Sequence, residues 1–387
     1  MTTKNNIPAG YKDSAVGIIP QEWEVKRLGA CFSIGHGRDY KHLSNGDIPV
    51  YGSGGIICYV GSFLHDGETV CIGRKGTINK PFYYNGPIWT VDTLFYTHSF
   101  QSVLPRYVGY LFDSIDWMRY NEATGVPSLT AKTISNIKKA VPPIAEQRKI
   151  AEILGVWDEV IEKQSRLIEK LELRKRALMQ RLLTGRTRLP GFTTSWQKVK
   201  LGEIGKFVSG CVFNENEQGG KVGFPFFKVS DMNLCGNEVR MTKSNNYVTQ
   251  EQIERLNYIV VKDEAIIFAK VGAAIALERK RYAKDFIIDN NMLAYVPDTN
   301  IWYMKYWFDS IKLSKYIQVG ALPSYNASDL AIIKLNLPSS PEQKAIAEVL
   351  TTADDEIATH RKKLDALRLQ KRGLMQQLLT GKTRVKI

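Results

Sequence analysis

Two short loops in this chain of 387 residues combine glycine with basic side chains. The first is Gly73-Arg74-Lys75-Gly76, and the second contains Lys270-Val271-Gly272. Glycine lets a backbone approach a phosphate closely, and an arginine beside it can reach a guanine edge in the major groove of DNA. The two loops therefore predict contacts with nucleic acid, although for each residue taken singly a solvated cation on a hairpin is an equally good interpretation.

Further basic residues near predicted turns extend this prediction. Arg38, Lys41 and His42 flank a turn in the first half of the chain, and the cluster Arg279-Lys280-Arg281 follows the second loop. The formal net charge of +14 divides into +7 for residues 1–188 and +7 for residues 189–387, which favours two equivalent anion-binding modules over one basic tail. The complete set of predicted DNA-contacting residues is Arg38, Lys41, His42, Arg74, Lys75, Lys228, Lys270, Arg279, Lys280 and Arg281.

Residue patterns that would support catalysis are incomplete. Thr380-Gly381-Lys382-Thr383 resembles the end of a phosphate-binding loop, but Gln376 stands where that motif requires a glycine. Asp298 and Glu342 superficially resemble nuclease carboxylates, but Glu342-Gln343 recurs as Glu146-Gln147 and is better explained by helix capping. The five histidines and five cysteines have no metal-ligand spacing. We therefore predict no catalytic site, no metal site and no cofactor in this chain.

A repeat organises the whole chain. Residues 146–188 align without gaps on residues 342–384 at an offset of 196, and 21 of the 43 aligned pairs are identical. Near the start of each half, Trp23 and Trp196 precede a Leu-Gly pair by five residues at an offset of 173, so the second half contains 23 additional residues. The chain therefore consists of a variable globule followed by a repeated segment, each present twice.

Both repeated segments are predicted to be long helices, because apolar residues recur at alternating spacings of four and three, as in a coiled coil. Ser340-Pro341 with Gln343 predicts a cap and a capping box, and Gly185 and Gly381 predict the helix ends. The predicted seam comprises Ile150, Leu154, Trp157, Ile161, Gln164, Ile168, Leu171, Lys175, Leu178 and Leu182 in the first helix, and Ile346, Leu350, Ala353, Ile357, His360, Leu364, Leu367, Lys371, Leu374 and Leu378 in the second.

The two seams predict an antiparallel pair of helices. Near its middle, Gln164 would face His360, and a buried polar contact there would set the register of the pair; an exposed polar pair is the equally good alternative. The fold class that follows is α+β, with two mixed α/β globules separated by two long antiparallel coiled-coil helices and related by an internal pseudo-twofold repeat. The predicted boundaries are 1–142 for globule 1, 143–188 for the first helix, 189–339 for globule 2 and 340–387 for the second helix.

Within the globules, stretches rich in β-branched residues, glycine and Asn/Asp turns predict many short strands. Helices are expected at about 106–120 and 301–317. No apolar run approaches the ~20 residues that would cross a bilayer, and the amino terminus does not resemble a secretory signal, so we expect no association with a membrane.

The doubled EQ-x-x-IAE…KR-x-LMQ-x-LLTG-x-TR helices, each following a variable globule, resemble the specificity subunit of Type I restriction-modification systems. The likeness covers nearly the whole chain, and the doubled helix motif is its most specific part. The globule segments that resemble two varieties of that family's target recognition domain are Gly37–Gly55, Ile72–Ile78 and Trp89–Tyr96 in globule 1, and Pro225–Asn233, Phe268–Ile275 and Ile288–Tyr295 in globule 2.

The resemblance implies a DNA-binding subunit that is not itself an enzyme. Each recognition domain would read one half of a bipartite, asymmetric site in double-stranded DNA, while the helices would set the gap and dock two methyltransferase (modification) subunits. S-adenosylmethionine would then be bound by those partners, and ATP with Mg²⁺ by two restriction-translocase subunits where the system includes them. The family also implies the cytoplasm of a prokaryotic cell.

The residues alone leave two other functions open. One is a nuclease or methyltransferase with its own active site, which the incomplete motifs disfavour. The other is a coiled-coil scaffold that binds proteins rather than DNA, against which the Arg/Gly loops argue only weakly.

Overall fold

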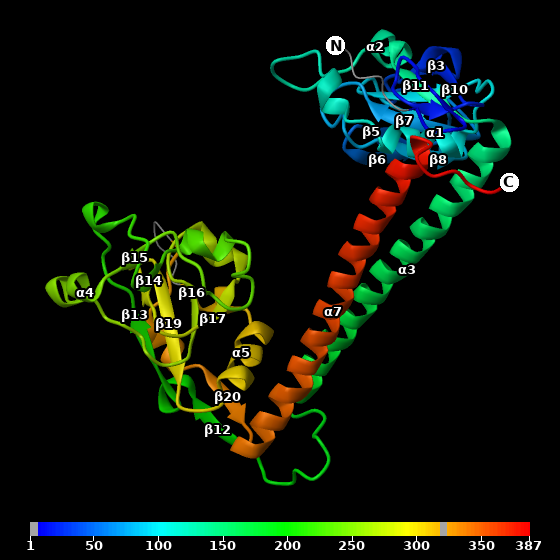
Figure 1. The fold of residues 1–387 in the computed structure, drawn as a ribbon. Helices are drawn as coiled ribbons and strands as arrows, with labels where there is room; N and C mark the ends of the chain where they lie inside the picture. Colours follow the sequence, from blue (N-terminus) through cyan, green and yellow to red (C-terminus); the bar gives the residue numbers. More distant parts are fainter. Residues whose placement is uncertain (1–6, 318–322) are drawn as a thin grey trace. The chain divides into compact units, whose positions relative to one another are not determined.

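The computed structural model describes residues 7–317 and 323–387, which fold into two compact units (Figure 1). Unit 1 contains Met1–Arg166 and Arg361–Ile387, and unit 2 contains Leu167–His360. Each unit therefore consists of one globule and one half of each long helix.

The two long helices pair antiparallel within each unit. Their bounds are Ile144–Leu182 for α3 and Ser340–Leu379 for α7. In unit 1, Ile150 near the start of α3 shares a core with Leu378 near the end of α7. In unit 2, Leu182 at the end of α3 shares a core with Ile346 near the start of α7. The prediction of two long antiparallel helices is confirmed.

Every residue of the predicted seam is buried or half-buried. Gln164 is 7% exposed and His360 is half-buried, but they belong to different units, so their mutual contact stays a prediction. Gly185 and Gly381 lie just beyond the two helices with φ of +71° and +70°, in the left-handed region that glycine adopts at helix ends. The helix ends are thus as predicted.

The predicted capping box at the start of α7 is wrong. The Gln343 side chain does not turn back to the backbone at the helix start; its Nε2 donates to the Pro338 carbonyl oxygen at 2.9 Å, and its Oε1 accepts from the Asn300 backbone N–H at 3.3 Å. Gln147 makes the equivalent contacts in unit 1, with the Pro142 carbonyl oxygen at 2.9 Å and the Leu104 N–H at 2.8 Å. These glutamines join each long helix to its globule.

The described part of globule 1, from residue 7 onward, contains four small sheets and two short α-helices. The antiparallel four-stranded sheet has the order β4 (Ser33–His36), β10 (Leu94–His98), β7 (Glu68–Gly73) and β8 (Phe82–Asn85). The three-stranded sheet has the order β6 (Gly55–Val60), β5 (Asn45–Gly52) and β9 (Trp89–Thr90). The two-stranded sheets pair β1 (Tyr11–Lys12) with β2 (Ile19–Pro20) and β3 (Glu24–Arg27) with β11 (Lys138–Val141). The helices are α1 (Pro105–Asp113) and α2 (Ala131–Asn136), with 3-10 turns η1 (Leu28–Ala30) and η2 (Trp117–Tyr120).

Globule 2 repeats this plan. Its four-stranded sheet has the order β13 (Gly205–Ser209), β19 (Met292–Pro297), β16 (Ala265–Ala269) and β17 (Lys280–Ala283). Its three-stranded sheet has the order β15 (Tyr247–Val248), β14 (Phe224–Phe227) and β18 (Ile287–Ile288), and β12 (Gln197–Lys200) pairs with β20 (Lys334–Leu337). The helices are α4 (Gln250–Leu256), α5 (Ile301–Ser310) and α6 (Ala327–Ala331), with 3-10 turns η3 (Leu201–Glu203), η4 (Glu215–Glu217), η5 (Val229–Asn233), η6 (Ala273–Leu277) and η7 (Leu313–Tyr316).

The helix expected at 106–120 is shorter than predicted. It ends at Asp113, and η2 follows as a separate turn. Beyond the helix, the Trp117 indole N–H donates to the Phe112 carbonyl oxygen at 2.9 Å, an acceptor that a continued α-helix would use for its own backbone. In globule 2, α5 likewise ends at Ser310 before η7. Over the described ranges, no helix is both long and apolar enough to cross a membrane.

Candidate nucleic-acid interface

The predicted basic loop of globule 1 follows β7 and is held by the backbone of a neighbouring segment. The Gly76 N–H donates to the Pro127 carbonyl oxygen at 2.8 Å, and the Leu129 N–H donates to the Arg74 carbonyl oxygen at 2.9 Å. Gly76 has a φ of +92°, which a residue with a side chain adopts only with strain. The Arg74 and Lys75 side chains are exposed, so the loop presents two cations to solvent.

The basic loop of globule 2 is the same structural element. The Gly272 N–H donates to the Pro323 carbonyl oxygen at 2.9 Å, and the Tyr325 N–H donates to the Lys270 carbonyl oxygen at 3.0 Å. Each of these residues lies 196 positions after its counterpart in globule 1, and Gly272 has a φ of +82°. Lys270 is half-buried, whereas its counterpart in globule 1 is exposed.

A second loop in globule 1 carries the other predicted cations. The Trp89 indole N–H donates to the Arg38 carbonyl oxygen at 3.0 Å, and the Arg38 N–H donates to the Thr90 carbonyl oxygen at 2.8 Å. The His42 ring lies 6.0 Å from the Trp89 ring in an edge-on arrangement. Arg38, Lys41 and His42 are all exposed.

The segment after β9 links the two basic loops of globule 1. The Arg74 N–H donates to the Thr93 carbonyl oxygen at 2.8 Å, and the Arg74 guanidinium donates to the Asp92 carbonyl oxygen at 3.0 Å. The turn between β5 and β6 is also adjacent, because a Cβ on Gly76 would lie 3.0 Å from Ser53 Oγ. The structure thus brings all five predicted cations of globule 1 onto neighbouring loops.

Most of the predicted residues of globule 2 already have protein partners, and three of them are half-buried. Lys228 is half-buried and its Nζ donates to Gln218 Oε1 at 3.1 Å. Arg279 donates to the Asn233 side chain and Arg281 to the Lys280 carbonyl oxygen at 3.3 Å, and both arginines are half-buried. The basic surface of globule 2 is therefore less exposed than that of globule 1.

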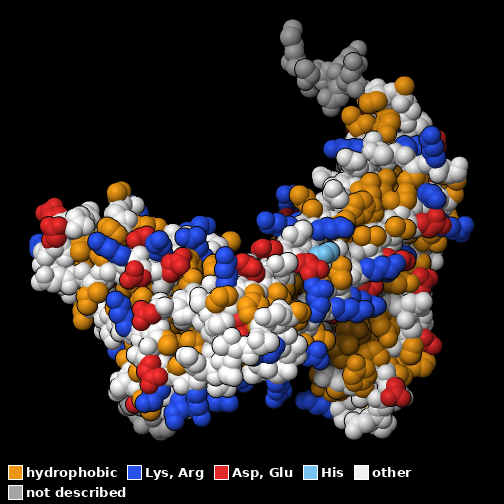
Figure 2. Space-filling model, turned by 90° about the horizontal axis from the view of Figure 1, so that it is seen from below, with side chains coloured by type: hydrophobic (Ala, Val, Ile, Leu, Met, Phe, Trp, Pro, Cys, Tyr) orange, Lys and Arg blue, Asp and Glu red, His pale blue; other side chains and the backbone are white. Residues whose placement is uncertain are grey.

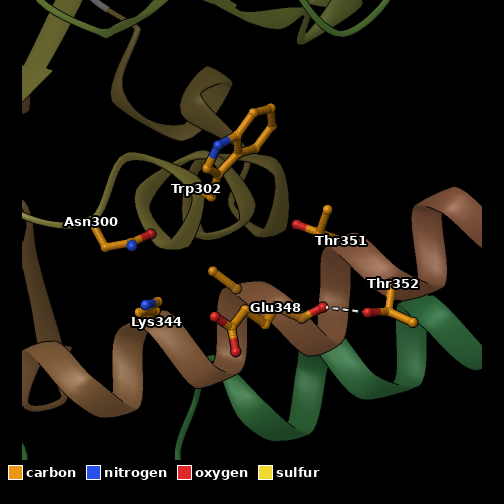
Figure 3. A pocket seen from close by; sticks show the side chains of 7 residues that line it. Asn300, Trp302, Lys344, Glu348, Thr351 and Thr352 are labelled. Carbon is orange, nitrogen blue, oxygen red and sulfur yellow. Dashed lines mark hydrogen bonds between the residues drawn. The ribbon is translucent and has the colours of Figure 1, made fainter.

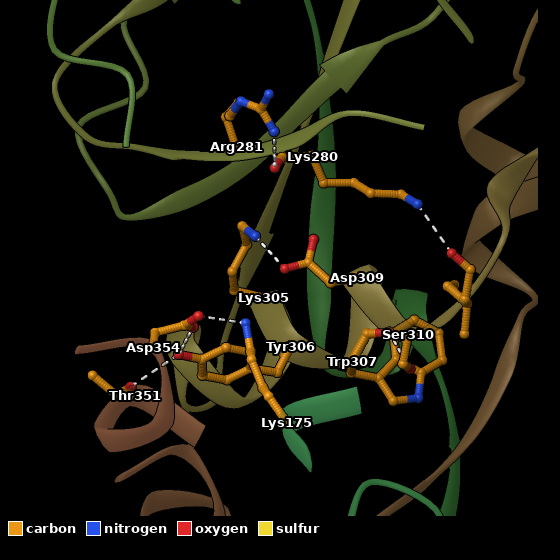
Figure 4. Close-up of polar contacts among 11 residues, drawn as sticks. Lys175, Lys280, Arg281, Lys305, Tyr306, Trp307, Asp309, Ser310, Thr351 and Asp354 are labelled. Carbon is orange, nitrogen blue, oxygen red and sulfur yellow. Dashed lines mark hydrogen bonds and ion pairs between the residues drawn. The ribbon is translucent and has the colours of Figure 1, made fainter. Parts of the chain in front are cut away.

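Lys280 is a poor candidate for DNA contact, which corrects the prediction. Its side chain is buried, and its Nζ lies 2.6 Å from Glu278 Oε2 and 3.0 Å from the Ile311 carbonyl oxygen. Figure 4 shows the Lys280 and Arg281 side chains pointing in different directions, with a hydrogen bond drawn from the Lys280 ammonium. Lys280 and Arg281 are neighbours on β17, and successive side chains of a strand point to opposite faces. This alternation explains why Lys280 is buried while Arg281 remains half-buried.

Sequence reasoning missed a buried glutamate at the base of each globule. Glu146 is fully buried and accepts from the Trp23 indole at 2.9 Å and from Arg384 Nε at 2.7 Å. Glu342 accepts equivalently from the Trp196 indole at 3.0 Å and from Arg188 Nε at 2.5 Å. The sequence does indicate this cluster, since the Trp, Glu and Arg each recur in both halves of the chain. Helix capping, however, also explains a glutamate at the start of a helix, so the recurrence alone does not predict the ion pair.

An open cavity of about 370 Å³ lies between α5 and α7 in unit 2 (Figure 3). Trp302 forms one wall and stacks on Tyr282 with a ring separation of 5.2 Å. Its lining is Asn300, Trp302, Lys344, Ala347, Glu348, Thr351 and Thr352. None of these lining residues is among those predicted to contact DNA.

On the face drawn in Figure 2, Lys and Arg side chains form several groups interspersed with acidic and apolar side chains.

Comparison with known proteins identifies the family to which both halves of the chain are similar. The family model described as Type I restriction modification DNA specificity domain matches twice, at residues 20–173 and 194–369. The Type I restriction enzyme MjaVIII specificity subunit of Methanocaldococcus jannaschii is 28% identical in an alignment of 305 positions that covers 68% of this chain and 66%, just under two thirds, of that relative. The putative type I restriction enzyme MjaX specificity subunit of the same organism is 26% identical in an alignment of 427 positions, gaps included, that covers 97% of each chain.

Two solved structures share the fold. The S subunit of a Type I restriction-modification system from M. genitalium superimposes with a TM-score of 0.57 at 15% identity, covering 98% of each chain. A chain from a structure describing complex assembly and conformational transition of the type I R-M system gives a TM-score of 0.62 at 16% identity, covering 94% of this chain and 99% of that one. Since the family model covers both halves, this chain belongs to the Type I restriction-modification DNA specificity family, as a specificity subunit with two DNA-recognition domains.

Proposed function

We propose that each globule reads one half of a bipartite, asymmetric sequence in double-stranded DNA. The observation that carries this proposal is the pair of equivalent basic loops, Arg74–Gly76 and Lys270–Gly272, held by the same backbone hydrogen bonds at an offset of 196. A shared loop geometry with cations suits the phosphate backbone, which is the same at every DNA sequence.

The differences between the globules support an asymmetric site. Globule 1 exposes Arg74 and Lys75, whereas globule 2 has half-buried Lys270 and the apolar Val271 at the same places. Side chains at base edges decide which bases are read, so unlike side chains on a shared scaffold favour unlike half-sites.

We also propose that the long helices set the gap between half-sites and dock two methyltransferase subunits. Leu173 of α3 is 61% exposed and Leu369 of α7 is 63% exposed, and they are 196 positions apart. In this proposal the two leucines supply equivalent apolar contacts, one for each copy of the partner. In this proposal the chain itself is not catalytic, and S-adenosylmethionine and ATP with Mg²⁺ belong to the methyltransferase and restriction partners in a prokaryotic cytoplasm.

Selection from a pool of random duplexes tests the proposal. The full chain, alone and with its methyltransferase subunit, should enrich two short motifs separated by an unspecified gap of constant length. Enrichment should weaken steeply as salt rises, because phosphate contacts release counterions. If no motif is enriched even with the partner present, the DNA-reading function is wrong and the scaffold function is favoured instead.

A further inference from the structure

Each apolar seam is interrupted by a lysine, Lys175 in α3 and Lys371 in α7, at equivalent positions of the repeat. Their side chains are only 20% and 15% exposed. Partial burial of a charge costs free energy unless the charge is paired, so a lysine at such a place needs a specific partner.

In unit 1 that partner is an aspartate of α3. Lys371 Nζ lies 2.5 Å from Asp158 Oδ1, and the Tyr110 hydroxyl donates to Asp158 Oδ2 at 2.6 Å. The ammonium also lies 5.1 Å from the centre of the Tyr110 ring, within the range of a cation–π contact. Tyr110 belongs to α1, so the cluster joins three elements: the globule, α3 and α7.

Unit 2 contains the same cluster, which Figure 4 shows. Lys175 Nζ lies 2.6 Å from Asp354 Oδ1, the Tyr306 hydroxyl donates to Asp354 Oδ2 at 2.8 Å, and the ammonium lies 5.2 Å from the Tyr306 ring centre. Tyr306 belongs to α5, the counterpart of α1. All three residues lie 196 positions from their counterparts in unit 1, with the two helices exchanging roles.

The two clusters specify a single register. Asp158 and Lys175 are 17 residues apart on α3, and Lys371 and Asp354 are 17 residues apart in the opposite direction on α7. The apolar seam alone would accept a slip of seven residues, because its pattern repeats every seven. Such a slip would place Asp158 opposite Leu364 or Leu378 and would separate both lysines from their aspartates. Asp158 would keep only its ion pair with Arg106 of α1, at 3.4 Å, whereas in unit 2 the uncharged Trp302 stands at the position equivalent to Arg106.

We propose that Lys175 and Lys371, with Asp354 and Asp158, are positioning residues that hold the helix pair in one register and tie each recognition domain to it. Together with the Glu146–Arg384 and Glu342–Arg188 pairs, which join the same two helices near their ends, they restrict the protein to one gap between half-sites. This inference rests on the proposed function, because it concerns the spacing of the two DNA motifs. A half-buried ion pair adds little stability compared with an apolar residue of similar size, but it does select one arrangement among alternatives.

The test is gap selectivity of the full-length double variant Lys175→Met/Lys371→Met. Duplexes carry both half-sites of the wild-type motif, separated by every gap within ten base pairs of the preferred one. We expect the variant to unfold at the same or a higher temperature than wild type and to bind a second gap, about 3 bp from the first, since seven helical residues span about 10 Å. The control Lys170→Met/Lys362→Met removes the same charge from exposed positions on the same helices and should keep the single gap.

Charge exchange in unit 2 gives an independent check that does not depend on the stability of the methionine variant. Asp354→Lys should broaden the gap distribution, and adding Lys175→Asp should restore a single gap because it rebuilds the pair with its signs reversed. Adding Lys371→Asp instead should not restore it, because that residue contacts the cluster of unit 1.

The outcomes separate the two proposals. If wild type itself shows no preferred gap, the bipartite function fails. If wild type prefers one gap and both the methionine variant and Asp354→Lys prefer the same one as sharply, the positioning role is overturned and the clusters serve stability alone.

Discussion

At the scale of residues, the role of each cation depends on what the fold places beside it. Lys270 and Lys280 are both basic residues close to Gly272 in the sequence. Lys270 begins a loop equivalent to that of Arg74, whereas Lys280 is buried and paired with Glu278. Composition and spacing predicted the basic loops correctly as structural elements. They could not distinguish Lys280, because strand alternation and the position of Glu278 depend on tertiary contacts.

Single substitutions in the loops should act on one half-site each. Arg74→Ala should weaken recognition of one half of the motif by about 1–3 kcal/mol per lost contact, while Lys270→Ala should affect only the other half. Binding to duplexes in which either half-site is randomised measures this. Equal loss at both halves from either substitution would contradict the modular account.

Glu278 predicts a pH dependence of stability in globule 2. Burial alone would raise the pKa of its carboxyl, but hydrogen bonds from Lys280 and Ser314 outweigh burial and lower the pKa from 4.5 to about 2. A carboxylate with a lowered pKa in the folded state stabilises the fold above its unfolded pKa, and this contribution disappears as the pH falls through the folded pKa.

Glu278→Gln should therefore lower the melting temperature at pH 7, and its difference from wild type should shrink between about pH 4.5 and pH 2. Thermal unfolding of both proteins across that range measures the difference. The exposed Glu254→Gln serves as the control for replacement of a surface glutamate elsewhere in globule 2. A difference that stays constant with pH would show that the Glu278 charge does not stabilise the fold.

At the scale of elements, the repeated helices were predictable because their pattern is long and periodic, and the structure confirms α3 and α7 as an antiparallel pair in each unit. The reasons for the two lysine interruptions were not predictable. Asp158 and Tyr110 lie far from Lys371 in sequence, and only the folded chain shows that the three meet. The same holds for Glu146, whose partners come from both ends of the chain.

Breaking the Glu146 cluster should destabilise unit 1. Arg384→Met would leave a fully buried carboxylate with the Trp23 indole but without its cation, at a cost of about 3 kcal/mol. Urea unfolding measures the loss, and adding Glu146→Gln should recover much of it by removing the unpaired charge. A loss below about 1 kcal/mol would show that the pair contributes little.

The exposed leucines of the two long helices, Leu173 and Leu369, predict where partner subunits dock. Leu173→Asp should remove one methyltransferase subunit from the complex and Leu369→Asp the other, because the two leucines are equivalent and lie in different units. Native mass spectrometry of each variant with the partner measures the stoichiometry. Two bound subunits in both variants would place the docking surface elsewhere.

At the scale of the whole molecule, the sequence shows a duplicated unit and the structure extends the duplication into the globules. Their segments resemble different varieties of recognition domain, yet both contain a four-stranded sheet of the same order and a basic loop held by the same bonds. Strand order and backbone contacts tolerate many side chains, so sequence comparison of the two globules underestimates their likeness.

Shortening both helices by one heptad should shorten the gap. Deletion of residues 163–169 and 360–366 takes one heptad from each helix, preserves the seam pattern and leaves the residues of both lysine clusters in place. The preferred gap should fall by about 3 bp, because seven residues of helix span about 10 Å. An unchanged gap would rule out the helices as the spacer.

The most direct test of the central claim is the methylome of a prokaryotic cell that lacks other methyltransferases and expresses this chain with its modification subunit. The account predicts methylation within one bipartite motif, with two different halves and one constant gap, which disappears when this chain is omitted. Methylation of a single continuous motif, or of the same sites without this chain, would contradict it.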